Sequence, residues 1–465
     1  MKKPVPLNKI SRLFILTLIC LVTAISCVDS FKTNKRIPTI PIDNDNQQSP
    51  KDLPHQDSNT DTTAAKFKCV DRQNDEQYSQ SPIVILVSID GFRADYLQKY
   101  KPTTLSQLAK AGLYTEGMRP SFPTHTFPNH YSLVTGLAPG NHGIVSNKFY
   151  DKKRGQFYNF MDPKTAGDRT WYKGEPIWNT VERQGMISMT YHWVGSDANI
   201  NKKDPTCFIG YDPDISTIDK VNKTIEWLNL PTNKRPHLIT IYTSIVDSAG
   251  HKYGPDSKEV ADAIYEVDAA LAQLNTFIQS SSLPINLIIV SDHGMEKIDN
   301  TKIIYLSDYI DLTGFKMSDR GAVTMLYHDN AETIEKAYLV LKKHENHYKV
   351  YRRNETPAEF QLNDQDRIGD LVVIADIPYF ILDKSFTATP LALNSATHGW
   401  SFHNPSMKAL FIAHGPQLKK KQLIPEFQNI DVYPFILKIL GLQIDQPIDG
   451  QAASLENYIV RPTNK

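Results

Sequence analysis

The chain has 465 residues, and its 51 lysines and arginines balance its 51 aspartates and glutamates, so the formal net charge is zero. This length accommodates one large α/β domain with insertions, or two domains. The neutral balance argues against general nucleic-acid binding, which usually needs a basic surface. None of the four cysteines forms a CxxC pair, which argues against a zinc site made of thiolates.

The N-terminal segment has the pattern of an export signal, and residues 1–27 are predicted to be a signal peptide. Basic side chains precede an apolar stretch, Leu13–Ile25, that is too short for a comfortable membrane span. Ala24–Cys27 resembles a bacterial lipoprotein cleavage box with Cys27 as the lipidated residue, so lipidation and ordinary signal cleavage both stay open. We therefore expect an exported protein of the bacterial periplasm or outer envelope, or a secreted one. Membrane contact is expected only through a lipid anchor at Cys27.

A polar segment follows the signal. Residues 28–80 are rich in Asn, Asp, Gln, Ser, Thr and Pro and lack apolar periodicity, which predicts a disordered tether. Export would place Cys69 and Cys207 in an oxidising compartment, where a disulfide can form. The sequence alone leaves open whether these two cysteines pair.

The folded part, residues 81–460, contains apolar runs that end in acidic or histidine side chains. Short runs rich in β-branched residues and without alternation are typical of strands buried on both faces of a parallel sheet. An amphipathic helix is predicted over Asp256–Gln279, as βαβ units require. The expected fold is an α/β/α three-layer sandwich with a mostly parallel central sheet. The three runs are Ile83–Asp90, His237–Asp247 and Ile285–His293.

These runs predict a site at one edge of the sheet. In open α/β sheets, ligands bind beyond the carboxyl ends of the strands. Mixed aspartate and histidine ligands suit zinc or a similar divalent ion. We therefore expect five side chains to converge there: Asp90, Asp247, His251, Asp292 and His293.

A long segment between the third run and Thr397 has elements of its own. It is predicted to be an inserted subdomain over about residues 300–392. After it, the chain is expected to return to the sheet. The predicted elements of the insertion are strands Ala322–Tyr327 and Asp370–Ala375 and a helix Asn330–His344; those of the return are a strand Ala409–Ala413 and a helix near Asp431–Leu442.

Two further segments complete the predicted site. Within Ser121–Tyr131, Pro128 favours the first turn of a helix, which places Thr126 at its N-terminus. Free amides there, such as that of Phe127, can hold a phosphate oxygen. A hydroxyl in this position, next to a metal, can lose its proton and attack phosphorus. The segment Ala396–Trp400 supplies another histidine, His398.

With these residues in view, the chain resembles the nucleotide pyrophosphatase/phosphodiesterase family of the alkaline phosphatase superfamily, in its compact bacterial form. The resemblance extends from about Pro82 to Leu455. It rests on five motifs that occur here in the family order: an aspartate before GFR, a threonine before FPNHY, D-x-x-G-H, S-D-H-G-M and T-H-G. Their joint occurrence is far more specific than any one of them.

The resemblance implies two Zn²⁺ ions per chain and a role for each residue that matches a motif. Thr126 would be the nucleophile that forms a phospho-threonine intermediate, and Asn147 would donate to a non-bridging phosphate oxygen. Water would then release a nucleoside monophosphate. One metal would be held by Asp247, His251 and His398, and the other by Asp90, Thr126, Asp292 and His293.

The resemblance is weaker for the residues that would bind the substrate. Phe127 and Tyr242 match positions where family aromatics line the nucleotide pocket. Trp193 begins a segment similar to the family W-P-G-S-D, but valine replaces the proline. His125 stands where vertebrate members often carry lysine. These departures leave the metal ligands intact and the substrate preference open. Five other histidines are predicted to be structural or surface groups: His130, His142, His192, His403 and His414.

The favoured interpretation is a hydrolase of nucleotide phosphodiesters and pyrophosphates, with small-molecule substrates and no nucleic-acid duplex as partner. The first alternative is a phosphodiesterase acting on phospholipid headgroups or other non-nucleotide esters, and a phosphomonoesterase is a further one. A sulfatase is disfavoured because no cysteine begins a C-x-P-x-R segment. A non-catalytic binding lipoprotein of the envelope is a different class, against which the complete ligand set and Thr126 argue.

Overall fold

A nine-stranded sheet organises the part of the chain that this computed structural model describes, residues 67–384 and 395–460. Its strands, in chain order, are β1 (Phe67–Cys69), β2 (Ile83–Ile89), β3 (Leu113–Tyr114), β6 (Ser188–Tyr191), β7 (Cys207–Ile209), β8 (Leu238–Thr243), β9 (Ile285–Val290), β18 (Phe411–His414) and β19 (Gln422–Leu423). Their order in space is β1-β7-β6-β8-β2-β9-β18-β3-β19. The signal peptide, the proposed anchor Cys27 and tether residues 28–66 lie outside the described residues. Among those residues, no helix combines the length and apolarity that a membrane span requires.

The three apolar runs form the centre of this sheet. Every residue of β2, β8 and β9 is buried, as expected for strands covered on both faces. The strand pairs β7–β6, β6–β8, β8–β2 and β2–β9 are all parallel. Antiparallel pairing begins outside this block, where β18 joins β9 and β1 joins β7. The predicted, mostly parallel sheet is therefore confirmed.

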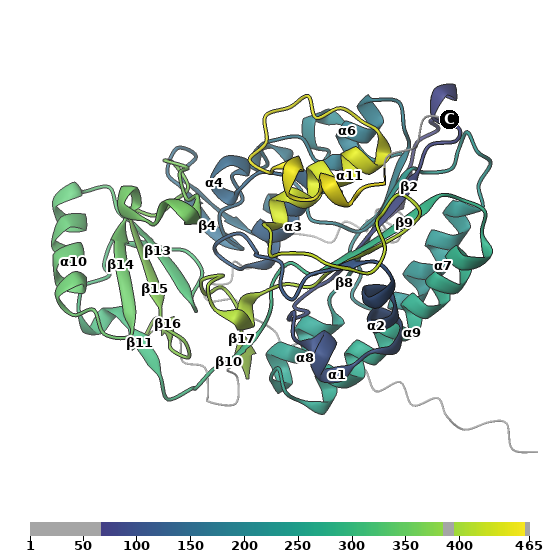
Figure 1. Ribbon diagram of the computed structural model, residues 1–465. Coiled ribbons are helices and arrows are strands. Elements are labelled where there is room, and N and C mark those ends of the chain that lie inside the picture. Colours follow the sequence, from purple (N-terminus) through teal and green to yellow (C-terminus); the bar gives the residue numbers. More distant parts are fainter. Residues whose placement is uncertain (1–66, 385–394, 461–465) are drawn as a thin grey trace, which may run out of the picture. The chain divides into compact units, whose positions relative to one another are not determined.

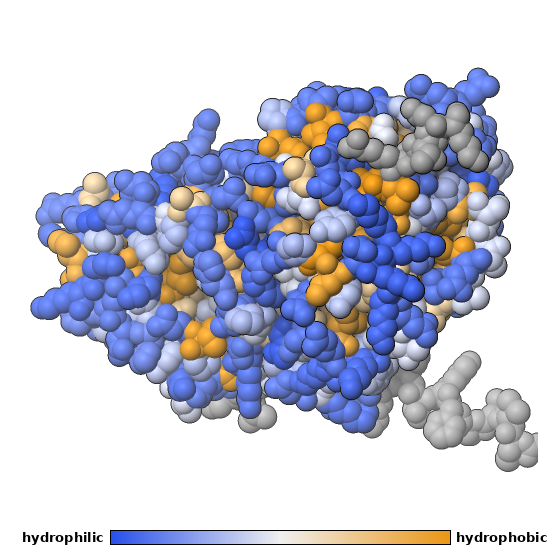
Figure 2. Space-filling view, in the orientation of Figure 1, coloured by the Kyte–Doolittle hydropathy of each residue, from blue (hydrophilic) through white to orange (hydrophobic). Residues whose placement is uncertain are grey.

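Helices cover both faces of the sheet (Figure 1). Successive side chains of β2 enter two different hydrophobic cores: Val84 and Leu86 one, Ile85 and Val87 the other. The first core contains residues of α3 (Thr126–Thr135), α6 (Ile177–Arg183) and α11 (Val432–Leu440); the second, residues of α2 (Thr103–Ala111), α7 (Thr217–Leu228), α8 (Ile245–Tyr253) and α9 (Lys258–Ser280). The three-layer α/β/α sandwich predicted from the sequence is confirmed. In Figure 2 most of the visible face is hydrophilic, and hydrophobic residues show only in separate groups between the charged ones.

A second sheet lies in the segment where an insertion was expected. It has four antiparallel strands in the order β12 (Lys316–Met317), β13 (Val323–Tyr327), β15 (Leu371–Ala375) and β14 (Tyr348–Arg352). Side chains of α10 (Ala331–Lys343) and of this sheet share a separate hydrophobic core. The two strands and the helix predicted in this segment are confirmed within one or two residues.

The chain enters and leaves this segment side by side. β10 (Glu296–Lys297), just after the third run, pairs antiparallel with β17 (Ala396–Thr397). This two-residue ladder places His398 next to the segment that carries His293, although they are far apart in the sequence.

A disulfide fixes the first strand to the edge of the central sheet. Cys69 lies opposite Cys207 in the antiparallel pair β1–β7, and the two are disulfide-bonded. The pairing that the sequence left open is thus present. The predicted tether is too long at its carboxyl end, because Phe67–Cys69 is a strand of the sheet. The sequence did not predict this short strand because the residues around it are polar. Its attachment to the sheet depends on Cys207, which is far away in the sequence.

Removing this disulfide should lower stability without abolishing activity. The bond closes a loop over a sequence separation of 138 residues, and loss of a native disulfide usually costs about 2–5 kcal/mol. We expect the double variant C69A/C207A to show a lower free energy of unfolding in urea, with near-normal turnover at low temperature. Equal unfolding midpoints for the double variant and the oxidised wild type would contradict a stabilising role.

Candidate active site

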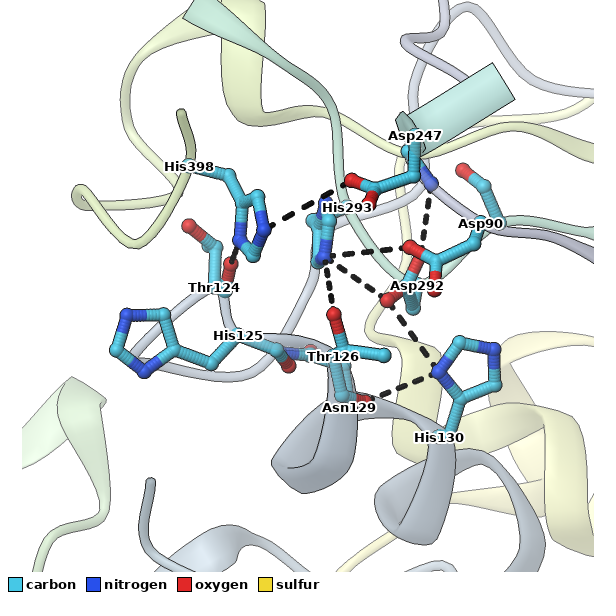
Figure 3. A network of polar contacts seen from close by, with 12 residues as sticks. Asp90, Thr124, His125, Thr126, Asn129, His130, Asp247, Asp292, His293 and His398 are labelled. Carbon is cyan, nitrogen blue, oxygen red and sulfur yellow. Dashed lines mark hydrogen bonds and ion pairs between the residues drawn. The ribbon is translucent and has the colours of Figure 1, made fainter. Parts of the chain in front are cut away.

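The carboxyl ends of the central strands bring the predicted carboxylates together (Figure 3). Asp90 follows β2, Asp292 follows β9, and Asp247 lies in the first turn of α8, just after β8. Parallel strands in register end at the same edge, as the pairing of Ser88 with both Tyr242 and Val290 shows. Two groups of ligand atoms result, each within 4.8 Å: Asp247, His293 and His398, and Asp90, Asp292 and His293. Of the predicted ligands, His251 joins the cluster through its Nε2, 3.4 Å from Asp247 Oδ1.

Three carboxylate oxygens in this cluster are buried without a hydrogen-bond donor: Asp90 Oδ1, Asp247 Oδ1 and Asp292 Oδ2. Imidazole nitrogens face them instead. His293 Nε2 lies 2.9 Å from Asp292 Oδ2 and 3.6 Å from Asp90 Oδ1, and His398 Nε2 lies 3.8 Å from Asp247 Oδ1. Buried anionic oxygens without donors are costly. This donor set therefore fits divalent cations.

The histidines are oriented as metal ligands would be. The Nδ1 atom of each lies against a backbone carbonyl: His251 at 2.9 Å from Ala396, His293 at 2.9 Å from Gly294, and His398 at 2.7 Å from Thr124. A carbonyl oxygen only accepts, so Nδ1 donates the proton and Nε2 is directed at the carboxylates. Outer hydrogen bonds of this kind fix the tautomer and ring orientation of metal-binding histidines.

The second oxygens of two carboxylates are held by the protein itself. The Tyr242 hydroxyl donates to Asp90 Oδ2 at 2.6 Å, and the Gly91 amide donates to Asp292 Oδ1 at 3.1 Å. Each of these aspartates thus has one oxygen fixed and the other left for a ligand. Gly91 has a φ of +66°, and a Cβ there would lie 2.9 Å from Asp247, so the close approach requires glycine.

The electrostatics of the cluster favour a bound cation. Burial, followed by the charges of Asp292 and Asp247, raises the pKa of Asp90 well above its usual value. Burial alone would lower the pKa of His293, but the negative charge of Asp292 outweighs it and raises that pKa. A proton on His293 thus partly compensates for the acids. A bound divalent cation would replace that proton, as metal binding generally does.

Thr126 begins α3, as predicted, and its hydroxyl reaches the cluster. Thr126 Oγ1 lies 3.2 Å from His293 Nε2. The Phe127 amide, predicted to hold a phosphate oxygen, instead donates to Asn147 Oδ1 at 2.9 Å. This is a correction to the sequence interpretation: the free amide is already engaged. The side-chain NH₂ of Asn147 remains as the donor at this end of the helix.

His130 is a site residue that the sequence interpretation missed. Its ring is fully buried, with Nδ1 3.3 Å from Asp292 Oδ2 and 3.0 Å from the Thr126 carbonyl. Its Nε2 lies 2.8 Å from Ser88 Oγ. His130 thus connects the start of α3 to the end of β9. Its spacing of four residues from Thr126 on a helix was the available signal.

The aromatic residues differ in what they can contact. Trp193 is fully buried, and its Nε1 donates to the His130 carbonyl at 2.9 Å. The ring therefore packs against α3, and the predicted contact of Trp193 with substrate stays a prediction. Phe127 is partly exposed and lies 5.1 Å from Phe160, ring to ring. Tyr211, which the sequence interpretation omitted, is 42% exposed with its ring 6.0 Å from that of Tyr242.

The fold and the site together define the class of protein, and comparison with known proteins agrees. The architecture is that of the alkaline phosphatase superfamily, with human ectonucleotide pyrophosphatase/phosphodiesterase 5 as a structural neighbour (TM-score 0.76, 30% identity, 82% of this chain and 100% of that chain). Residues 84–401 match the family model described as type I phosphodiesterase / nucleotide pyrophosphatase. The chain belongs to this family.

Individual relatives show the same relationship. Venom phosphodiesterase CdcPDE of Crotalus durissus collilineatus is 34% identical over 86% of this chain and 50% of its own length. Ectonucleotide pyrophosphatase/phosphodiesterase family member 1 of Mus musculus is 36% identical over 82% of this chain and 43% of its own. The chain therefore spans about half the length of the curated relatives it matches. A second structural neighbour is an inactive variant of murine ectonucleotide pyrophosphatase/phosphodiesterase 5 in complex with AMP (TM-score 0.75, 29% identity, 81% of this chain and 100% of that chain).

Removal of divalent metal should destabilise the protein measurably. A ligand present at 100 to 1,000 times its Kd stabilises the folded state by about 3–4 kcal/mol. We expect a chelator to lower the thermal unfolding midpoint and added metal to restore it. Asp292→Asn should lose most of this response. Asp268→Asn is the matched control, since Asp268 is a buried carboxylate that accepts from the Thr104 and Leu105 amides of α2; it should be less stable yet keep the response. Identical midpoints for chelated and metal-loaded wild type would contradict the cation site.

Proposed function

We propose that this protein is a two-zinc hydrolase that cleaves nucleotide phosphodiester and pyrophosphate bonds and releases nucleoside monophosphates. The observation that carries the proposal is the Thr126 hydroxyl at the start of α3, 3.2 Å from His293 Nε2 and beside the unpaired carboxylates. Family membership supports it. The AMP complex of the murine neighbour supports a nucleoside monophosphate as product.

The proposed metal ligands fall into two neighbouring sets. When bound, the zinc ions would supply positive charge that stabilises the developing negative charge on phosphate oxygens. The chain's own part is to hold the ligands in place through the backbone carbonyls, Tyr242 and Gly91. The proposed sets are Asp247, His251 and His398, and Asp90, Thr126, Asp292 and His293.

Thr126 would act as the nucleophile in a two-step reaction. First, a bond forms between Thr126 Oγ1 and phosphorus, the bond to one ester or phosphoanhydride oxygen breaks, and the hydroxyl proton passes to solvent. Then water supplies an oxygen to phosphorus, the bond to Thr126 breaks, and the hydroxyl is restored. Asn147, oriented by the Phe127 amide, would donate to a non-bridging phosphate oxygen throughout.

The surroundings of Thr126 favour a diester over a monoester. A monoester dianion carries one more charged oxygen, yet the chain neighbours of Thr126 are His125 and Phe127, and the proposed phosphate donor Asn147 is neutral. Phe127 and Tyr211 offer partly exposed rings on which a base could stack. A phosphodiesterase of phospholipid headgroups would use the same metals, so the metal site does not distinguish the two substrate classes. The partly exposed aromatic rings favour a nucleotide substrate. The complete ligand cluster with Thr126 argues against a non-catalytic binding lipoprotein.

Export is also part of the proposal. A disulfide between Cys69 and Cys207 suits an oxidising compartment such as the periplasm or the outside of the cell. The proposed signal peptide and lipid anchor at Cys27 agree with this location, and no partner beyond the small-molecule substrate is proposed.

Loss of the Thr126 hydroxyl should abolish turnover while leaving fold and metal in place. Removing a nucleophile commonly costs several orders of magnitude in rate. We expect this loss for Thr126→Ala with p-nitrophenyl thymidine monophosphate, at unchanged metal content. Thr135→Ala is a matched control because Thr135 lies at the other end of α3, where its hydroxyl donates to the Tyr131 carbonyl and accepts from the Leu137 amide. Near-normal hydrolysis by Thr126→Ala with full metal content would refute the covalent mechanism.

The diester preference should depend on Phe127. We expect p-nitrophenyl thymidine monophosphate to be cleaved with far higher kcat/KM than p-nitrophenyl phosphate. A base–aromatic stack is worth roughly 1–3 kcal/mol, so Phe127→Ala should weaken nucleotide cleavage about tenfold and spare the monoester. Tyr265→Ala removes an exposed ring on α9 and serves as control. A higher kcat/KM for the monoester would overturn the phosphodiesterase proposal, and an unchanged nucleotide rate in Phe127→Ala would favour the headgroup alternative.

A further inference from the structure

One carboxylate of the insertion reaches the catalytic part of the chain. Asp319 lies between β12 and β13, and its Oδ2 accepts from the Ser146 hydroxyl at 2.7 Å and from the Lys148 amide at 2.7 Å. In return, the Asp319 amide donates to the Lys148 carbonyl at 3.2 Å. The residue between these two contacts is Asn147. A single side chain thus holds the Ser146 hydroxyl on one side of Asn147 and the Lys148 amide on the other.

The same carboxylate is linked to the start of α3. Because the Ser146 hydroxyl has one proton and directs it to Asp319, its oxygen accepts from His125 Nδ1 at 3.0 Å. His125 is buried and directly precedes Thr126. The other side of its ring abuts the Gly399 backbone, where an added Cβ would lie 2.5 Å from Nε2. This hydrogen-bonded chain, from His125 through Ser146 to Asp319, leaves the ring little freedom to shift.

Burial raises the pKa of Asp319 to about 6, against the lowering effect of its donors. The side chain is therefore ionised at pH 7 and above, where a carboxylate is the strongest acceptor for these hydrogen bonds. Among the described residues, the Asp319 carboxylate hydrogen-bonds to Ser146 and Lys148 and lies 3.9 Å from His125 Nδ1; it bonds to neither the proposed metal ligands nor Thr126. Any effect on the reaction must be exerted through Ser146 and Lys148, which flank Asn147, or through His125, which precedes Thr126.

We infer that Asp319 is a positioning residue that orients Asn147 and the start of α3 for phosphoryl transfer. Asp319 holds the two neighbours of Asn147, through the Ser146 hydroxyl and the Lys148 amide, and Asn147 Oδ1 accepts from the Phe127 amide. Its NH₂ can then be presented in one direction only. The inference rests on the proposed function, in which that NH₂ contacts the phosphate. Through Asp319 the insertion would affect catalysis, because a displacement of a substrate-positioning group such as Asn147 by about 1 Å can lower the rate a hundredfold.

The kinetic test is a double-mutant cycle on p-nitrophenyl thymidine monophosphate. Asp319→Ala should lower kcat about 10- to 100-fold, with a much smaller change in KM. Asp319→Asn can still present one oxygen to Ser146 and Lys148 and should recover part of the loss. In an Asn147→Ala background, Asp319→Ala should cost much less than in the wild type, because only the path through Ser146 and His125 remains. Ser146→Ala removes the hydroxyl that donates to Asp319 and should also lower kcat. This variant provides the test if Asp319→Ala is unstable.

Asp370→Ala is the matched control. Asp370 is another carboxylate of the insertion, and it accepts from Lys152 and Arg353 away from the site. The Asp370→Ala variant should be less stable than the wild type and have an unchanged kcat. Unchanged kcat in Asp319→Ala, with Asn147→Ala impaired, would overturn the inference while the proposed function stands. Fully multiplicative losses in the double variant would also overturn it.

A structural measurement separates this inference from the proposed function. A crystal structure of Asp319→Ala should show Asn147 Oδ1 displaced from the Phe127 amide, from the 2.9 Å contact of the wild type. This result does not depend on which substrate the enzyme cleaves. An unmoved Asn147 would overturn the inference, whatever the activity of the wild type proves to be.

Discussion

The unpaired negative charge at the carboxyl edge of the central sheet is the constraint on which the rest of the structure depends. Three buried carboxylate oxygens lack hydrogen-bond donors, and each faces an imidazole Nε2 at 2.9–3.8 Å. Such an arrangement is costly unless cations fill it. The protein maintains it by fixing the atoms around it: carbonyls hold the histidine Nδ1 atoms, while Tyr242 and Gly91 hold the second oxygens of two of the three aspartates.

The fold brings these groups together from distant parts of the chain by simple means. Parallel register delivers Asp90, Asp247 and Asp292 to one edge. The short ladder between β10 and β17 closes the insertion and returns His398 to the same place. Helix α3 contributes both Thr126, at its first residue, and His130, one turn later, which faces Asp292. The insertion is joined to this arrangement through Asp319, so it contacts the machinery that orients Asn147.

Much of this could be predicted from the sequence, for physical reasons. Unbroken apolar runs specify strands buried on both faces, and polar residues directly after them must lie at the carboxyl edge. That reasoning located Asp90, Asp247 and Asp292, and Pro128 located the start of α3. The contacts of Asp319 and Tyr211 depend on how separate segments pack, and no local pattern encodes them, whereas His130 had one local signal in its spacing of four residues from Thr126. For the same reason the burial of Trp193 and the engagement of the Phe127 amide by Asn147 were missed.

The central claim is that the cluster holds two zinc ions, and anomalous X-ray diffraction at the zinc absorption edge tests it most directly. Crystals of protein supplied with zinc should show two anomalous peaks about 4 Å apart. One peak should be bounded by Asp247, His251 and His398, and the other by Asp90, Thr126, Asp292 and His293. No peak within this cluster, or a single peak that leaves the Thr126 side empty at saturating zinc, would contradict the account.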